Sequence, residues 1–91
     1  MTNVAATNVT AAGVIADGPV VLAGVILALS GAGTIKIYDN ASAATGTVLF
    51  TATLAAAGHV HFDYPGNGVQ ALNGLFLAVS AGTIEGSVLI A

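Results

Sequence analysis

The feature that most constrains this sequence is an uninterrupted apolar run from Val20 to Leu29. The run follows Asp17-Gly18-Pro19 and precedes Ser30-Gly31-Ala32-Gly33, and both flanking segments are typical of turns. It is about half as long as the roughly 20 residues that a membrane-spanning helix needs, and no Lys or Arg flanks it. A short apolar run between turn signals predicts a strand that is buried on both faces.

Most of the remaining sequence alternates apolar and polar residues, which is the pattern of a half-buried strand. Alternation occurs over 34–38, 47–54 and 83–90. It is clearest at 59–64, where Val60, Phe62 and Tyr64 form the apolar face and His59, His61 and Asp63 form the polar face. We therefore expect an all-β protein, an antiparallel β-sandwich of jelly-roll type with seven to eight short strands.

The chain length of 91 residues fits a single domain. A short duplication, Thr2-Asn3-Val4 followed by Thr7-Asn8-Val9, opens the sequence and carries no charge. We interpret residues 1–12 as an extended N-terminal arm and residues 13–91 as a single β-sandwich domain. The alternative is an arm that pairs with a neighbouring subunit.

Strict alternation along the apolar run leaves no polar face. It places Val20, Leu22, Ile26 and Ala28 on one face of the strand, and Val21, Ala23, Val25, Leu27 and Leu29 on the other. A strand with two apolar faces needs cover on both sides, and in so short a chain we expect a second copy to supply one cover. The alternative is a central strand that its own chain covers. The segment from Leu75 to Val79 has the same property, and the predicted interface residues are Val21, Val25, Leu27, Leu29 and Phe76.

Charge is scarce throughout the sequence. Only 5% of residues are charged, with one Lys, no Arg and a formal net charge of -3, whereas an ordinary soluble domain is about 25% charged. Phosphate backbones and anionic lipids are bound by clusters of Lys and Arg, so we expect neither a nucleic-acid partner nor a membrane partner. A surface this poor in charge is typical of a repeated part of a large assembly, held by packing rather than by ion pairs.

Only His59, His61 and Asp63 have the spacing of metal ligands. On a strand, residues two apart lie on one face about 6.6–6.8 Å apart, so the pair of histidines could chelate zinc or nickel. No further ligand is evident, and we interpret these residues as a solvent-facing polar face, with a metal at a subunit junction as the alternative. We predict no cofactor and no enzyme activity, because the sequence lacks a Gly-x-Ser-x-Gly nucleophile elbow and its acidic residues are scattered.

Three segments together resemble small all-β proteins from the structural gene clusters of tailed bacteriophages. They are Gly33-Thr34-Ile35-Lys36-Ile37-Tyr38-Asp39-Asn40, Gly46-Thr47-Val48-Leu49 and Gly74-Leu75-Phe76-Leu77, and the resemblance covers residues 19–90. It implies a virion structural protein, foremost a trimeric decoration (cement) protein that binds the major capsid protein on the capsid exterior. The alternative is a glycan- or receptor-binding module of a tail fibre or tail tip, which a concave surface with exposed aromatic residues would favour.

Overall fold

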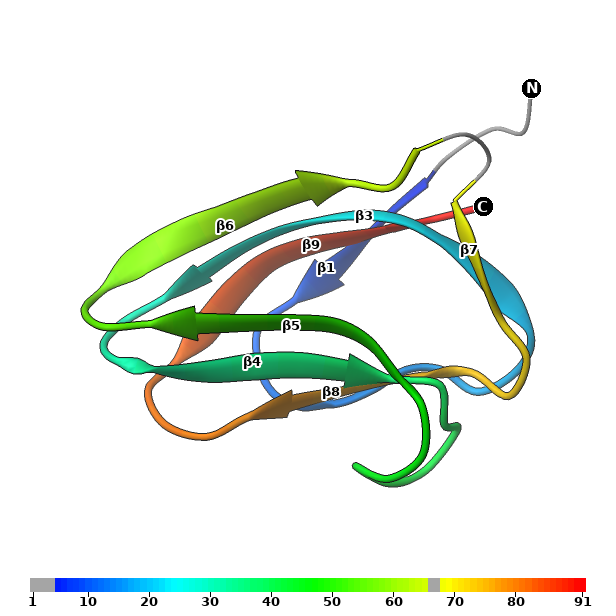
Figure 1. Ribbon diagram of the computed structural model, residues 1–91, viewed down its shortest axis with the longest axis horizontal. Helices are drawn as coiled ribbons and strands as arrows, with labels where there is room; N and C mark the ends of the chain where they lie inside the picture. The colour runs from blue at the N-terminus through cyan, green and yellow to red at the C-terminus, as the bar shows by residue number, and fades with distance from the viewer. Residues whose placement is uncertain (1–4, 66–67) are drawn as a thin grey trace.

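The computed structural model describes residues 5–65 and 68–91, which form two antiparallel sheets packed face to face (Figure 1). Sheet A has the strand order β1-β9-β3-β6, with β7 also paired to β3, and sheet B has the order β2-β8-β4-β5. The bounds are β1 Ala5–Val9, β2 Gly13–Ala16, β3 Val20–Leu29, β4 Gly33–Tyr38, β5 Val48–Leu54, β6 Gly58–Asp63, β7 Val69–Ala71, β8 Leu75–Val79 and β9 Ile84–Ile90. The predicted antiparallel β-sandwich is confirmed.

The pairing order is that of a jelly roll. Strand β1 pairs with β9, β2 with β8, β3 with both β6 and β7, and β4 with β5, as in a long hairpin rolled into two sheets. The described residues form nine strands rather than the seven to eight expected, because the N-terminal segment contributes a strand of its own.

That N-terminal strand corrects the expected domain boundary. Strand β1 is paired along its whole length with β9, from Ala5 opposite Ile90 to Val9 opposite Gly86. Val9 is buried in the core, so its apolar side chain ties the segment to the sandwich. The prediction of an extended arm over 1–12 is therefore wrong for residues 5–9, and residues 1–4 lie outside the described part of the chain.

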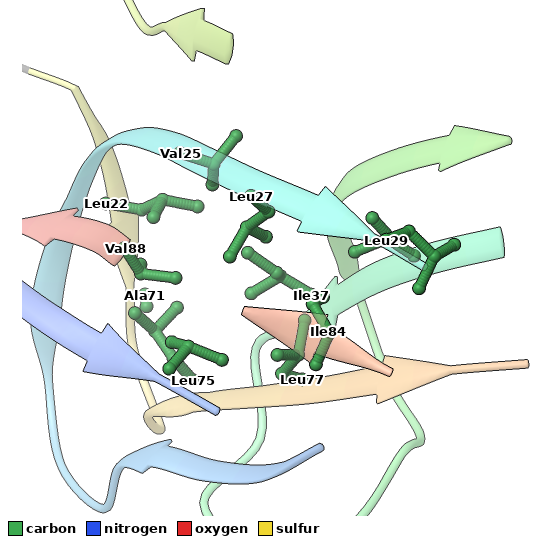
Figure 2. Packing of buried hydrophobic residues seen from close by; sticks show 12 residues of the cluster. Leu22, Val25, Leu27, Leu29, Ile37, Ala71, Leu75, Leu77, Ile84 and Val88 are labelled. Atoms are coloured by element: carbon green, nitrogen blue, oxygen red, sulfur yellow. The ribbon is translucent and has the colours of Figure 1, made fainter. Parts of the chain in front are cut away.

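One hydrophobic core fills the space between the two sheets (Figure 2). Side chains from both sheets point into it and are almost completely excluded from solvent. The buried members are Val9, Leu22, Val25, Leu27, Leu29, Ile35, Ile37, Ala71, Leu75, Leu77, Ile84 and Val88. Because the described strands supply both layers of this core, the sandwich closes within a single chain.

The apolar run forms β3, a strand of sheet A with partners on both sides. Its pairing with β9 shifts register between Leu22 and Gly24, so Ala23 is an extra residue, a β-bulge. The bulge reverses the sides to which later residues point, and Leu22 therefore shares the inner face with Val25 and Leu27. The grouping expected from strict alternation is wrong for this reason.

Because of this bulge, most of the predicted interface residues point into the core rather than outward. Val25, Leu27 and Leu29 are only 0%, 1% and 3% exposed, because they pack in the chain's own core with residues of sheet B. They cannot contact another molecule, and their assignment as interface residues is wrong. Val21 and Phe76 lie outside this core cluster, on the outer faces of sheets A and B, so their roles at an interface stay predictions.

Candidate interaction surfaces

The outer face of sheet A carries the predicted polar residues of β6. His61 Nε2 lies 3.3 Å from Asp63 Oδ2, and both side chains are exposed. Across the sheet, His61 is opposite Ile26, which is 45% exposed, and His59 is opposite Ala28. Within 5–65 and 68–91, no group of three His, Cys, Asp or Glu side chains is placed to hold a metal ion. This arrangement is a solvent-facing polar strand with one ion pair, formed when His61 is protonated.

The outer face of sheet B carries an apolar row that crosses all of its strands. Val14 of β2 is paired with Phe76 of β8. Phe76 is opposite Tyr38 of β4, and Tyr38 is opposite Val48 of β5. Val14 is 51% exposed and Val48 is 42% exposed, and the two aromatic residues between them are half-buried. These four residues, called the apolar row from here on, form a continuous apolar surface outside the core.

A shallow hollow of about 300 Å³ lies next to the apolar row. It is lined by Thr34, Lys36, Tyr38, Ala78, Val79 and Ser80. The Ser80 hydroxyl accepts a hydrogen bond of 2.8 Å from the Thr34 backbone N–H, and the hydroxyls of Thr34 and Thr53 lie 3.2 Å apart. The hollow therefore combines an aromatic residue, the chain's single Lys and several hydroxyl groups.

A larger hollow of about 370 Å³ lies at one end of the sandwich, between the β3–β4 turn and the start of β9. Glu85 is the charged residue in its lining. Ser30 Oγ accepts a hydrogen bond of 2.8 Å from the Thr83 N–H, and the Ser30 N–H donates to the Thr83 carbonyl at 2.9 Å. These polar groups are engaged in joining two turns, so the hollow is better explained as turn packing than as a ligand site.

Asp39 organises the loops at the opposite end of β4. Its carboxylate accepts hydrogen bonds from the backbone N–H groups of Asn73 at 2.8 Å and Leu72 at 3.1 Å. The bond from Asn73, followed by those from Leu72 and Gly74, lowers the pKa of Asp39 and outweighs the opposing effect of desolvation. The Asn40 side chain next to it accepts hydrogen bonds from the N–H groups of 42 and 43, so the 39–47 loop is held by local side-chain bonds.

Three aromatic residues close the side of the sandwich between β5 and β6. The ring centroids of Phe50 and Phe62 are 6.0 Å apart, and Phe62 meets Tyr64 edge-on at 4.8 Å. The Tyr64 hydroxyl donates a hydrogen bond to the Leu49 carbonyl, and burial raises the pKa of Tyr64. Phe50 and Tyr64 pack against the core, whereas Phe62 is 44% exposed because it lies on an edge strand.

The apolar row is the surface that the sequence reasoning missed, apart from Phe76. Tyr38 and Phe76 each follow an inward-facing Ile or Leu, so their outward direction can be read from alternation. Their meeting across the sheet depends on the register of β4 with β8, which pairs strands distant in the sequence. A useful signal was that both outward positions hold aromatic residues where a polar residue is usual.

Comparison with known proteins gives no relative for this chain. No protein-family model, no curated protein and no solved structure matches it. Among the described residues, no helix is long and apolar enough to cross a membrane. Function is therefore inferred from the topology and the outer faces of this chain, together with its sequence resemblance.

Proposed function

We propose that this protein is a structural component of a bacteriophage virion, namely a decoration protein bound to the outside of the capsid. The observation that carries the proposal is the apolar row Val14–Phe76–Tyr38–Val48 on the outer face of sheet B. A continuous apolar surface outside a completed core is characteristic of a protein contact. In this proposal the major capsid protein covers the apolar row.

The fold is compatible with this role without establishing it. Jelly rolls recur in viral capsid proteins and also in lectins, and a fold by itself does not determine a function. The resemblance to phage structural proteins includes three residues of the apolar row, namely Tyr38, Val48 and Phe76. The proposed contact therefore coincides with segments that carry the resemblance.

The distribution of charge favours the exterior of a capsid over its DNA-facing side. The chain has one Lys and no Arg, so it cannot neutralise several phosphates. Lys36 lies one row away from the apolar row, opposite Ala78 of β8 and Thr51 of β5. The proposed docking face therefore binds mainly by packing, and its affinity for the capsid should depend only weakly on salt. The homotrimer implied by the resemblance stays a prediction.

Copy number in purified particles tests the proposed location. A decoration protein is present in numbers comparable to those of the major capsid protein, whereas a tail component is present in a few copies. We expect quantitative gel analysis of virions from the producing strain to show a stoichiometry close to that of the capsid subunit. A stoichiometry of only a few copies per particle would assign the protein to the tail, and its absence from particles would end the proposal.

A matched pair of variants tests the docking face. Phe76→Asp places a carboxylate in the centre of the apolar row, and Ile26→Asp places one on the outer face of sheet A, where Ile26 is half-exposed. We expect Phe76→Asp to abolish binding to particles stripped of the native protein and Ile26→Asp to retain it. Thermal unfolding of both variants controls for folding. Equal binding by both variants, or loss only with Ile26→Asp, contradicts the proposed face.

A second candidate function is favoured by the hollow beside Tyr38. Aromatic rings and hydroxyl groups around a depression are features of carbohydrate sites, and this one also contains Lys36. A glycan-binding tail module would bind oligosaccharides of the host surface as the isolated protein. We expect oligosaccharide binding by such a module to be lost in Tyr38→Ala and kept in Ile26→Asp. Binding that survives Tyr38→Ala would rule out this hollow as the site.

A further inference from the structure

The edges of the two sheets differ in their protection against pairing with a further strand. In the described residues, β1 and β7 are short, and β2 is short and carries a register shift between Val14 and Ala16. Strand β6 presents His59, His61 and Asp63 along its length. Short strands, bulges and charged side chains are the usual devices against edge-to-edge association.

Strand β5 has much weaker protection of this kind. It forms the free edge of sheet B, where it pairs with β4 alone among the described strands (Figure 1). It is seven residues long, and the segment 45–57 that contains it has neither a charged residue nor a Pro. From Phe50 to Leu54 it follows β4 without a register shift. The register shift of this pair lies at the start of β5, before Phe50, so 50–54 is a regular, uncharged edge of the kind that can template another strand.

The sequence of this edge is complementary to itself. Around Ala52 it reads Phe50-Thr51-Ala52-Thr53-Leu54, so the residue classes are the same in both directions. Antiparallel pairing of two copies about Ala52 would place Thr51 opposite Thr53 and Phe50 opposite Leu54. Thr–Thr pairs and large apolar pairs are favourable across antiparallel strands. A shift by one residue would place threonines against the partner's apolar face, which fixes the register.

Charges do not oppose this approach. The nearest charged side chain on sheet B is Lys36 of β4, opposite Thr51. In the paired arrangement the two Lys36 side chains would be separated by three strand spacings, about 14 Å. That separation exceeds the Debye length of about 8 Å at physiological ionic strength. Two copies can therefore meet along β5 without appreciable like-charge repulsion.

Apolar side chains beside this edge add to the contact. Val48 lies at the start of β5, and Phe62 lies on β6, the edge of sheet A on the same side of the sandwich. Both are among the most exposed large apolar residues of the described chain. Pairing about Ala52 places Val48 opposite Ala56 of the second copy, so the two apolar rows lie at opposite ends of the seam.

We propose that a second copy of this chain binds at β5 by antiparallel strand addition centred on Ala52. The two copies of sheet B then form one continuous sheet. The pairing has two-fold symmetry, because both copies contribute the same strand. It therefore links copies in pairs, and a trimer would require a different contact. The proposal does not depend on the virion role, and it goes beyond that role because it concerns the isolated protein.

A double substitution at the proposed seam tests the pairing. Thr51→Glu/Thr53→Glu changes two exposed residues of β5, and the introduced carboxylates would stand directly opposite one another across the seam. Within one copy, the carboxylate at 51 would face Lys36, so the fold is preserved. We expect sedimentation velocity to give the native protein twice its mass of 8.8 kDa. We expect the double variant to raise the dimer dissociation constant more than about tenfold.

The matched control is Ala6→Glu/Asn8→Glu on β1. Strand β1 is an edge strand of sheet A, and both residues are exposed there. The control makes the same change in net charge, and we expect it to keep the native dissociation constant. A native protein that is a monomer overturns the proposal. An assembly of any size that survives the β5 substitutions, or that both double variants dissociate, overturns it as well.

Hydrogen exchange of the native protein provides a test that needs no variant. Amides of β5 that point away from β4 are protected only when a second strand covers them. We expect these amides to exchange slowly in concentrated solution and to lose protection on dilution below the dissociation constant. Exchange of the amides in 50–54 that point away from β4 should depend on protein concentration, and exchange of these amides that is independent of concentration would overturn the proposal.

Discussion

Gly86 occupies the middle of β9, a position where a strand usually carries a side chain. Its φ is 141°, and a Cβ added there would collide with the carbonyl oxygen of Ile26 on β3. Gly13 has nearly the same φ, 142°, but a Cβ there would meet open space. The two positions therefore separate the cost of backbone strain from the cost of a clash between strands.

We expect Gly13→Ala to lower the free energy of unfolding by about 1 kcal/mol, which is the cost of an unfavourable φ alone. Gly86→Ala should lower it by about 2–4 kcal/mol, because β3 and β9 must also move apart. Chemical denaturation of both variants measures the difference. Equal effects would mean that β9 does not approach β3 as closely as described.

The hydrogen bonds at Asp39 give stability that depends on pH. The bonds from Asn73, Leu72 and Gly74 lower the pKa of this carboxyl in the folded state. A depressed folded pKa stabilises the protein above the unfolded pKa, and the contribution is lost as the pH falls through the folded pKa. We expect Asp39→Asn to lower the Tm at pH 7 and the Tm difference to shrink below about pH 4.

The control for this prediction is Asp17→Asn, which makes the same change in net charge at an exposed turn residue. Asp17 makes no side-chain hydrogen bond among those of the described residues. Its variant should unfold at the native temperature. A Tm difference for Asp39→Asn that persists unchanged at pH 3 would contradict the role of the ionised carboxylate.

At the scale of single elements, β3 shows both what the sequence predicts and where prediction fails. The apolar run correctly indicates a strand bounded by turns, and period-two alternation identifies β4, β5 and β6. The prediction that this strand is buried on both faces is wrong, because Ile26 and Ala28 are exposed on the outer face of sheet A. The bulge at Ala23 is not visible in the sequence, because one extra residue among apolar neighbours leaves no polar marker of the reversed side. The predicted interface failed at Val25, Leu27 and Leu29 for this reason.

Two adjacent residues of β3 test which residues of this strand point into the core and which point outward. Leu27 is buried, whereas Ile26 faces outward from sheet A. We expect Leu27→Ala to lower the free energy of unfolding by about 2–5 kcal/mol, because it leaves a cavity in the core. Ile26→Ala should cost less than about 1 kcal/mol, since little buried contact is lost. The reverse order, measured by chemical denaturation, would place the bulge elsewhere.

The surfaces of the candidate site depend on information beyond single elements. Alternation predicts that Tyr38 and Phe76 both point away from the core. Only the register of β4 with β8 makes them neighbours. The apolar row therefore follows from pairings between strands that are distant in sequence. The polar face of β6, by contrast, depends on local alternation, and its direction was predicted correctly from the sequence.

For the whole molecule, the outcome is a jelly roll that completes its core from one chain and retains an apolar row on one outer face. The apolar strand β3, which suggested cover by a second copy, packs its inner face into the core of its own chain. Association, as proposed, takes place on surfaces outside the core, namely the outer face of sheet B and the β5 edge. Loss of a partner should therefore leave the fold intact while changing solubility.

A cryo-EM map of virions from the producing strain would show whether this protein covers the capsid and through which face it binds. We expect density for this jelly roll on the exterior of the capsid, with Val14, Phe76, Tyr38 and Val48 turned toward the major capsid protein. A capsid map without this density, or one in which the outer face of sheet A contacts the shell while the apolar row faces solvent, would contradict the proposed role.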